Sequence, residues 1–406
     1  MDIYDVFSNI NDSSIRYCHF KSNAELKRAF LGKGDFDILV HPDDYHVFIK
    51  ELLNLGFKQR FSTFNNQYVC SDNFLFYDAG NGLTQHFHLH TTLFFGEKLS
   101  KNHYLSETDE IINTSILNIS YPIKTIAPDY EYFLLILRII LKFKLFSVST
   151  LKLIVKKQRI PKDLESELNY LTKEVKNNTS RYSNISAFKG SKAVTDDFIQ
   201  RYNANKISLL YLFLLRIRLQ IKLRKYQRLP ALTSILQKTT RQIAKKQTLR
   251  WLGNGGKTIA IVGADGSGKT TLSKNLRHWL SYKLNSNVIY LGRPKSTIFR
   301  LISRAGSALK RLKLNRAGSI VHNNLDLHVA RKRKRCVERG IKQANSGKYI
   351  VFERYPMKEF WDMKTPMDGP RIPADNPLSE KENALLMSIP DHADITIVLS
   401  SKLENL

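Results

Sequence analysis

Residues 259–271 read IAIVGADGSGKTT, and this stretch decides the fold of the C-terminal part of the chain. Its first four residues are apolar and mostly β-branched, which is typical of a buried strand, and they lead directly into a glycine-rich turn. From Gly263 to Thr270 the turn has the spacing G-x-x-x-x-G-K-T, and the pattern that follows is helical. The stretch therefore predicts a phosphate-binding loop between a strand and a helix.

The residue types of this loop match the chemistry of phosphate groups. Glycines let successive backbone N–H groups turn toward phosphate oxygens, and the N-terminus of the following helix adds a positive dipole. Lys269 is predicted to place its ammonium on the β- and γ-phosphates of a nucleoside triphosphate, and Thr270 to offer a hydroxyl to Mg²⁺. The predicted ATP-binding set is Gly263, Gly266, Ser267, Gly268, Lys269, Thr270 and Thr271.

Strand and helix patterns alternate on the C-terminal side of the turn at residues 253–256, which read GNGG. Core strands are expected at Thr258–Val262, Val288–Leu291, Tyr349–Phe352 and Asp394–Leu399. A long basic helical region separates the second of these strands from the third. The pattern predicts an α/β domain over residues 251–406, with a parallel sheet and helices on both of its faces.

Three further features favour a kinase among the proteins that carry such a loop. Asp265 lies inside the loop, where most ATPases of this class need no acid. Glu353 follows a predicted core strand, where its carboxylate is placed to hold a magnesium shell or an acceptor hydroxyl, and Arg354 can hold an acceptor phosphate. Arg331 lies in the preceding basic run and is placed to clamp a second anion.

Residues 263–271 resemble the phosphate-binding loop of thymidylate kinases, G-x-D-x-x-G-K-[ST]-T, and residues 353–355 resemble the Asp-Arg-[Tyr/His] motif of that family. The resemblance implies ATP and Mg²⁺ as cofactors and a small phosphorylated acceptor. Asp265 would then contact the acceptor sugar, while Arg331 and Arg354 would bind the acceptor phosphate. The implied catalytic residues are Asp265, Lys269, Glu353 and Arg354, and the implied substrate-binding residues are Arg293, Arg331, Arg354 and Tyr355.

The chain departs from the thymidylate-kinase pattern in several places. Glu353 replaces an aspartate, and residues 291–294 read LGRP where the family has Arg-Glu-Pro, so that Arg293 is kept and the acid is lost. Residues 367–370 do not map onto a thymine pocket. We therefore expect the acceptor to be a nucleoside monophosphate or another small phosphorylated compound rather than thymidylate itself.

The resemblance also implies a basic lid and a fifth core strand beyond Leu406. Without them, water would remain at the γ-phosphate, and the chain alone is expected to be a poor or inactive phosphotransferase. Arginines elsewhere, Arg293 or those of residues 331–335, are the candidates to substitute for the lid.

The first 127 residues are expected to form an α+β domain, in which strands expected at 58–63, 67–71, 74–78 and 85–95 extend the sheet in antiparallel fashion. Residues 34–40 read GDFDILV, and strand alternation places Asp35 and Asp37 on one face, where two carboxylates can hold a divalent cation. Together with HFKSN at 19–23 and FHLH at 87–90, this resembles the nucleotidyltransferase fold, with His88 in the place of a third acid and Ser22 without its usual glycine. The three histidines at 86, 88 and 90 alternate and are expected to share a face, with hydrogen-bonded burial as the alternative to metal binding.

Residues 128–250 are predicted to form a basic helical region. Positions 201–250 hold thirteen Lys/Arg and no acid, which favours contact with anionic membrane surfaces or nucleic acid, or else a solvated basic face. The apolar stretches at 132–146 and 207–223 are interrupted by charges and are too short to span a membrane. A helix is favoured over a strand at 206–224, and a loop is expected at 177–190.

Three functions stay open on these observations. The first is a kinase, the second is a metal-dependent nucleotidyltransferase regulated by the P-loop domain, and the third is a non-enzymatic, nucleotide-gated binder of anionic surfaces. Three cysteines without a disulfide or zinc spacing, and an N-terminus without signal-peptide features, predict a cytoplasmic protein. If the basic segment binds lipid, we expect it at the inner face of a membrane.

Overall fold

The computed structural model divides into two compact units, Met1–Thr248 (unit 1) and Leu249–Leu406 (unit 2), and each is described by itself. The described residues are 1–62, 71–96, 101–105, 108–143, 148–156, 158–175, 186–230, 233–234, 236, 239–240, 249–361 and 368–400.

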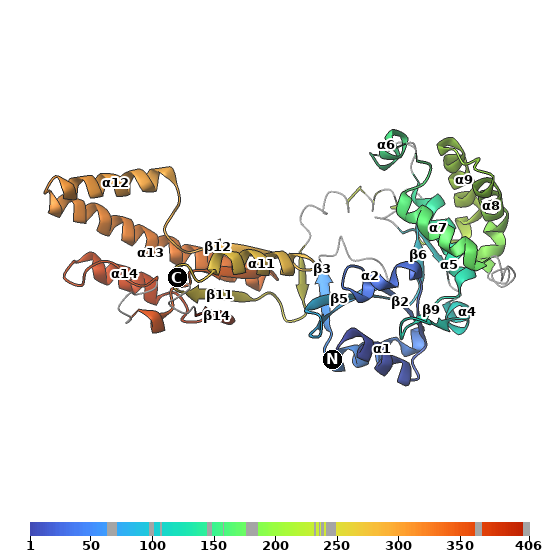
Figure 1. Ribbon diagram of the computed structural model, residues 1–406, viewed down its shortest axis with the longest axis horizontal. Helices are drawn as coiled ribbons and strands as arrows, with labels where there is room; N and C mark the ends of the chain where they lie inside the picture. The colour runs from blue at the N-terminus through green and yellow to red at the C-terminus, as the bar shows by residue number, and fades with distance from the viewer. Residues whose placement is uncertain are drawn as a thin grey trace. The chain divides into compact units, whose positions relative to one another are not determined.

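Unit 1 is built on a mixed sheet with the order β3-β4-β5-β2-β1-β9-β8. Of these strands, β3, β5, β2 and β9 are labelled in Figure 1. Its strands are β1 (Tyr17–His19), β2 (Phe36–Val40), β3 (Lys58–Ser62), β4 (Ser71–Asp78), β5 (Leu83–His90), β8 (Ile116–Leu117) and β9 (Lys124–Thr125). β2 and β5 are parallel, whereas β4 pairs antiparallel with β3 and with β5. The antiparallel extension predicted from sequence is confirmed, and most of the strand expected at 67–71 lies outside the described residues.

Helices flank this sheet, and a small hairpin of β6 (Leu93–Phe95) and β7 (His103–Leu105) accompanies it. The first helices are α1 (Ile3–Asp12), α2 (Leu26–Phe30), α3 (Tyr45–Asn54) and α4 (Thr108–Asn113). The second group is α5 (Pro128–Lys142), α6 (Val148–Val155), α7 (Lys162–Val175), α8 (Ser186–Asn203) and α9 (Leu209–Lys222).

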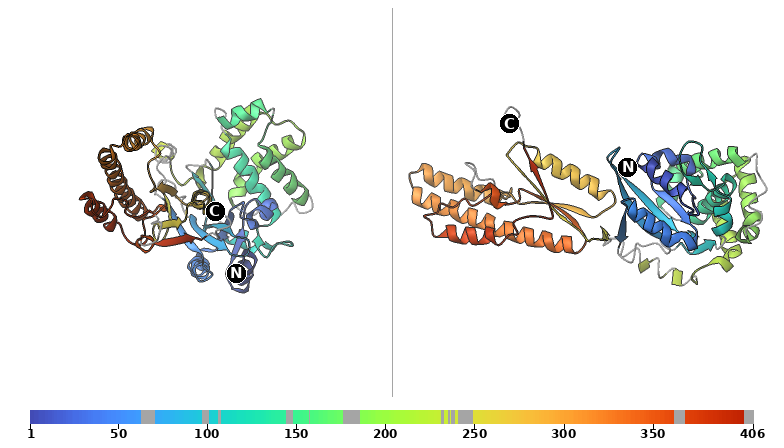
Figure 2. Two further views of the ribbon diagram at one scale, coloured as in Figure 1. Left: turned by 60° about the vertical axis from the view of Figure 1, so that its left-hand side comes forward. Right: turned by 90° about the horizontal axis from the view of Figure 1, so that it is seen from below.

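Side chains that alternate along the strands of unit 1 enter two separate cores. Ile38 of β2 and Phe87 of β5 pack with α1, α2 and α3 on one face of the sheet. Cys18 and Leu39 point to the other face, where they join the core that surrounds α5. Figure 2 shows the helices of the second group gathered together, away from α1. The α5 face is therefore the face on which the odd-numbered residues of β2 lie.

Two expectations for the helical region have different outcomes. The helix favoured at 206–224 is confirmed as α9, whose N-cap Ser208 accepts a hydrogen bond from the backbone N–H of Tyr211. The prediction of a loop at 177–190 is wrong for residues 186–190, which belong to α8. Among the described residues, no helix has the length and apolar character needed to cross a membrane.

Unit 2 contains a parallel sheet with the order β12-β13-β11-β14. Its elements are β10 (Arg250–Leu252), β11 (Thr258–Gly263), α11 (Lys269–Ser281), β12 (Ser286–Tyr290), α12 (Thr297–Arg311), α13 (Asn315–Asn345), β13 (Tyr349–Glu353), α14 (Leu378–Met387) and β14 (Ile395–Leu399). All four predicted core strands and the long basic helical region are present, so the predicted α/β class is confirmed here.

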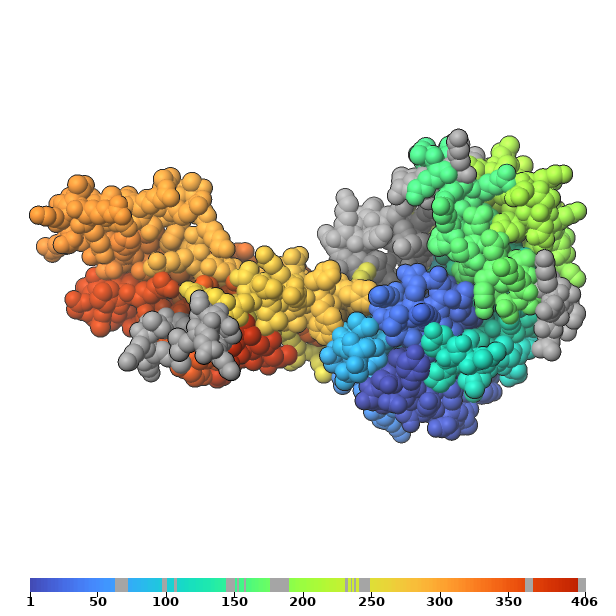
Figure 3. Space-filling model, viewed as in Figure 1, coloured from blue at the N-terminus to red at the C-terminus, as the bar shows by residue number. Residues whose placement is uncertain are grey.

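Helices cover both faces of this sheet, as the right-hand view of Figure 2 shows. Ala260 and Val262 pack into a core with α13 and α14, whereas Ile259 and Ile261 pack into a core with α11. Successive residues of β11 face opposite sides, and both sides are covered by helices. Every residue of the strand is therefore buried, as expected in a parallel sheet. α12 and the start of α13 form a helical hairpin that extends past the sheet (Figures 1 and 3).

The contact between α13 and β13 depends on a glycine. A Cβ atom added at Gly340 would lie 2.4 Å from Cζ of Phe352, a ring that is fully buried. The helix therefore rests directly on the strand that carries Glu353.

We predict that Gly340→Ala destabilises unit 2 despite the higher helix propensity of alanine. The propensity gain is about 1 kcal/mol, whereas overpacking a buried contact costs roughly 1–3 kcal/mol. Denaturant unfolding of the full chain should show a net loss for the variant. Adding Phe352→Leu should recover part of that loss, because it removes the ring that the new methyl group meets. A net gain in stability for Gly340→Ala would contradict this account of the packing.

Candidate functional site

The loop between β11 and α11 has the backbone that a phosphate-binding loop requires. Gly263, Gly266 and Gly268 all have positive φ, at 148°, 88° and 85°. A side chain at Gly263 would also meet the carbonyl oxygen of Leu399 at 2.6 Å. Gly268 is the N-cap of α11, so the first N–H groups of this helix are left for an anion rather than for a capping side chain.

Lys269 lies inside this loop. Its side chain is 5% exposed, and its ammonium donates to the carbonyl oxygen of Gly263 at 2.8 Å and to that of Ala264. The ammonium also lies 3.7 Å from the carboxylate of Asp265. A cation buried at the mouth of a glycine-rich loop is placed to meet the phosphates that the loop N–H groups would bind.

Thr270 and Glu353 contact each other directly. The Thr270 hydroxyl donates to Oε1 of Glu353, and the Ser273 hydroxyl donates to Oε2 at 3.3 Å. Glu353 is 5% exposed and ends β13, the neighbour of β11 in the sheet. A hydroxyl and a carboxylate are the hard oxygen ligands that Mg²⁺ prefers, so these two residues fit a magnesium site next to the phosphate loop.

Arg354 points back to the loop from the next position in the chain. Its φ of 65° is in the left-handed region, which is uncommon for a residue with a side chain. Its guanidinium pairs with Asp265 and lies 3.7 Å from Oδ1 of Asp368. The structure therefore brings Asp265, Lys269, Thr270, Glu353 and Arg354 together, and their roles in binding and catalysis stay predictions.

A second arginine, Arg333, supports this arrangement. The sequence named it only within the run 331–335, as a candidate to substitute for the lid, whereas the structure buries it against Asp368. It is 3% exposed, donates to the carbonyl oxygen of Leu291 at 2.9 Å, and pairs with Asp368 at 2.9 Å. Burial lowers its pKa, although Asp368 acts against the shift. The helical period of the sequence could have predicted its burial, because Arg333 lies on the same face of α13 as the buried Ala330 and Val337.

The other predicted substrate-binding residues are not part of the cluster around Lys269 and Arg354. Arg331 is on the exposed side of α13, out of phase with the buried stripe. Arg293 pairs with Asp326 at 2.7 Å. Tyr355 is buried and donates to the carbonyl oxygen of Pro390 at 2.7 Å, and burial raises its pKa to about 12. Tyr355 therefore packs the core instead of facing a ligand.

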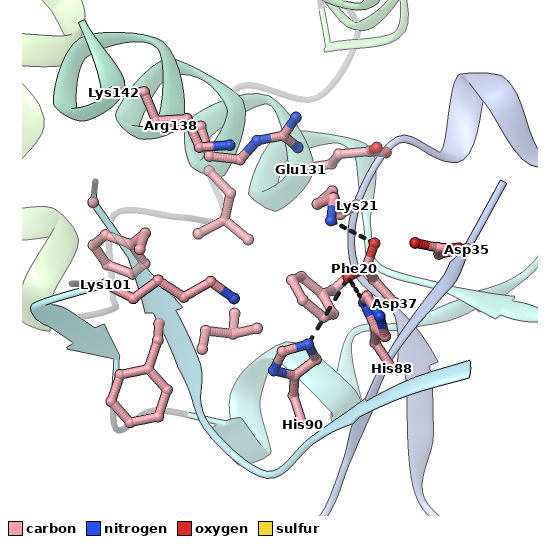
Figure 4. A pocket seen from close by; sticks show the side chains of 15 residues that line it. Phe20, Lys21, Asp35, Asp37, His88, His90, Lys101, Glu131, Arg138 and Lys142 are labelled. Atoms are coloured by element: carbon pink, nitrogen blue, oxygen red, sulfur yellow. Dashed lines mark hydrogen bonds and ion pairs between the residues drawn. The ribbon is translucent and has the colours of Figure 1, made fainter. Parts of the chain in front are cut away.

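In unit 1 the predicted metal residues Asp35, Asp37 and His88 line one cavity of about 550 Å³ (Figure 4). Asp37 is 7% exposed, and its Oδ2 accepts from the ammonium of Lys21. Burial acts to raise the pKa of Asp37, but Lys21 and the histidines of β5 outweigh it and hold that pKa well below its usual value. Asp35 instead pairs with His86, Nδ1 to Oδ1 at 3.0 Å. The two carboxylates thus have different partners.

Comparisons with known proteins add little to this geometry. No family model matches the chain, and no curated protein matches it. Among solved structures, the chain is similar to a thymidylate kinase from Candida albicans, at 20% identity and a TM-score of 0.22. That match covers 37% of this chain and 65% of that kinase, which is less than two thirds of its length.

We predict that the two neighbouring arginines of α13 differ sharply in their effect on stability. Arg333→Met removes the closer partner of the buried Asp368 and leaves only the Arg354 guanidinium, 3.7 Å away. It should cost about 3 kcal/mol of unfolding free energy, the lower end of the range for a broken buried pair. Arg331→Met, the matched control on the exposed side, should change stability by less than about 0.5 kcal/mol. Equal effects in denaturant unfolding would show that Arg333 is not the buried support described above.

Proposed function

We propose that unit 2 is an ATP-dependent phosphotransferase whose acceptor is a small phosphorylated compound of the nucleoside monophosphate class. The observation that carries this proposal is the meeting of Thr270 with Glu353 beside the Lys269 ammonium, with Arg354 facing the same loop. A triphosphate loop alone would serve any nucleotide-binding protein. The arginine that follows Glu353 adds a cation on the side of the loop where an acceptor phosphate would enter.

The donor triphosphate would be bound by the glycine loop and by Lys269. The Lys269 ammonium is already removed from water in the free chain, where it donates to two backbone carbonyl oxygens. On binding it would exchange these oxygens for phosphate oxygens, so no further desolvation of the cation is needed. Thr270 and Glu353 would hold Mg²⁺, which when bound neutralises phosphate charge and orients the β- and γ-phosphates. Their direct hydrogen bond keeps both oxygens at one place, next to the loop.

The acceptor would displace the contact between Arg354 and Asp265. Arg354 is half-buried and Asp265 is mostly exposed, so the aspartate can swing away at little cost. Arg354 would then bind the acceptor phosphate, and Asp265 would be free to accept from an acceptor hydroxyl. Asp368, held by Arg333, keeps a carboxylate near Arg354 and limits where its guanidinium can point. Catalysis would consist of positioning and charge neutralisation, with no covalent step on the protein.

Transfer of labelled phosphate from ATP tests the proposed reaction. Label in the γ position should reach a nucleoside monophosphate acceptor, and this transfer should be lost in Lys269→Ala. Label transferred from the α position would instead support nucleotidyl transfer, the alternative suggested by Asp35 and Asp37. Nucleotide binding without any transfer would leave the chain a nucleotide-gated binder and contradict the proposal.

We predict that Lys269→Ala abolishes triphosphate binding without unfolding the chain. Its ammonium is the loop cation placed on the phosphates, so calorimetry with ATP and Mg²⁺ should show at least a hundredfold loss of affinity. Lys274 is exposed on the same helix, so Lys274→Ala is the matched control and should bind ATP as the wild type does. Unchanged affinity in Lys269→Ala would rule out this assignment of the site.

We also predict that Arg354→Ala separates the two substrates. Acceptor binding should weaken by about ten- to a hundredfold, because a charge-assisted contact is worth roughly 1.5–3 kcal/mol. ATP affinity should change by less than threefold, and Arg331→Ala should affect neither substrate. Competition titrations with ATP and with a panel of nucleoside monophosphates measure both quantities. If ATP affinity falls and acceptor affinity does not, Arg354 contacts the donor triphosphate rather than the acceptor phosphate, which would contradict the assignment.

A further inference from the structure

Unit 1 places a carboxylate and two imidazoles on one face of its sheet. β2 and β5 are parallel neighbours, with Asp37 opposite His88 and Leu39 opposite His90. Because side chains alternate along each strand, Asp37, His88 and His90 point away from the core that holds Phe36 and Phe87. They point instead into the cavity on the α5 side (Figure 4).

Two overlapping groups of residues lie here, Asp35–His86–His88 and Asp37–His88–His90. Within each group, one donor atom from each residue lies within 4.8 Å of the others. The first group is already engaged. His86 Nδ1 lies 3.0 Å from Asp35 Oδ1, and its Nε2 lies 3.1 Å from Oδ1 of Asn73. Arg60 donates to that same amide oxygen, which identifies it as an acceptor. Both ring nitrogens of His86 therefore meet oxygen acceptors at hydrogen-bond distance.

The second group has a different spacing. Nδ1 of His88 lies 3.4 Å from Oδ1 of Asp37, and Nε2 of His90 lies 3.8 Å from the same oxygen. Both separations exceed the 2.7–3.2 Å of ordinary N–H···O hydrogen bonds. A tetrahedral ion with bonds of about 2.1 Å separates its ligand atoms by about 3.4 Å. The two measured N–O separations are close to this spacing, and one nitrogen of each histidine lies within 4.8 Å of the other, so the three residues can share an ion.

The second carboxylate oxygen of Asp37 completes the arrangement. Oδ2 accepts from the Lys21 ammonium, which leaves Oδ1 directed at the two imidazoles. A hydrogen-bonded outer partner that orients a ligating carboxylate is a regular feature of metal sites. Two imidazoles and one carboxylate select a transition metal over Mg²⁺, which prefers an all-oxygen shell.

We propose that Asp37, His88 and His90 bind one divalent transition-metal ion, and that the ion's open coordination position binds an anionic ligand in the cavity. Three protein ligands leave at least one such position. The metal set differs from the one expected from sequence, because His90 takes the place of Asp35. The site is independent of the phosphotransferase proposed for unit 2.

The cavity wall indicates the class of the second ligand. Lys21, Lys101, Arg138 and Lys142 line it together with the apolar side chains Phe20, Phe94 and Phe95. Glu131 also lines it, but both of its oxygens already accept from Asn23, each at 2.8 Å. Lys21 pairs with Asp37, and Arg138 lies 3.6 Å from the carboxylate of Glu167, so Lys101 and Lys142 add two further cations to this wall. A basic wall beside a metal position favours a phosphate-bearing ligand, whose apolar portion the phenylalanines can cover.

Titration of the metal-free full chain with Co²⁺ tests the metal site. The titration is done in millimolar Mg²⁺, which occupies oxygen-only sites such as Thr270–Glu353, and is followed by visible absorption and calorimetry. We expect one Co²⁺ per chain, with at least a hundredfold loss of affinity in His88→Gln and in His90→Gln. His86→Gln is the matched control from the same strand and should change the affinity by less than threefold.

Two results would overturn the metal site. One is the absence of a stoichiometric Co²⁺ site in the wild-type chain, and the other is an equal loss of affinity in His86→Gln and His90→Gln. X-ray absorption on the zinc-loaded wild-type chain gives a readout that needs no variant to fold. It should count two imidazole ligands, and a spectrum with oxygen ligands only would also contradict the proposal.

Inorganic phosphate tests the anionic ligand. Phosphate binding is measured in the Lys269→Ala background, which removes the loop of unit 2 as a competing site. The zinc-loaded chain should bind phosphate at least tenfold more tightly than the metal-free chain, and Lys142→Ala should reduce that gain. Equal phosphate affinity with and without zinc would overturn this half of the proposal.

Discussion

The contact between Thr270 and Glu353 is the interaction on which the proposed active site depends. It joins the first turn of α11 to the end of β13, and it exists because β11 and β13 are parallel neighbours, with Ile261 opposite Glu353. Parallel pairing brings the carboxyl ends of both strands to one edge of the sheet. The glycine-rich loop, the Thr270 and Glu353 oxygens and Arg354 therefore meet there without any help from distant loops.

The same edge carries a high density of buried charge. Lys269, Arg333 and Glu353 are each at most 5% exposed, and removing an ion from water costs several kcal/mol unless it is paired. Each has its partners in place: backbone carbonyls for Lys269, Asp368 for Arg333, and two hydroxyls for Glu353. In unit 1, parallel pairing likewise gives a buried charge its partners, because the neighbouring strands β2 and β5 set Asp37 beside the histidines of β5.

Local patterns predicted much of this structure. The loop at 263–271, the four core strands of unit 2 and the shared face of the alternating histidines at 86, 88 and 90 follow from periodicity and glycine spacing alone. The partners of buried charges could not be predicted, because they depend on strand register and on which residues approach from other elements. Asp35 and Asp37 look equivalent in GDFDILV, yet Asn73 helps to fix His86 on one of them and Lys21 reaches the other. The resemblance implies Arg331 as the phosphate-binding arginine of this helix, but helical phase places Arg333, not Arg331, on the buried face of α13.

The most direct test of the central claim is the crystal structure of the full chain with Mg²⁺ and a non-hydrolysable ATP analogue. The account predicts the β- and γ-phosphates in the loop of Gly263–Thr270, in contact with the Lys269 ammonium. It also predicts Mg²⁺ about 2.1 Å from the Thr270 hydroxyl oxygen, with Glu353 in its ligand shell or bonded to its waters. A triphosphate bound elsewhere, or a magnesium ion held without Thr270 and Glu353, would contradict the account.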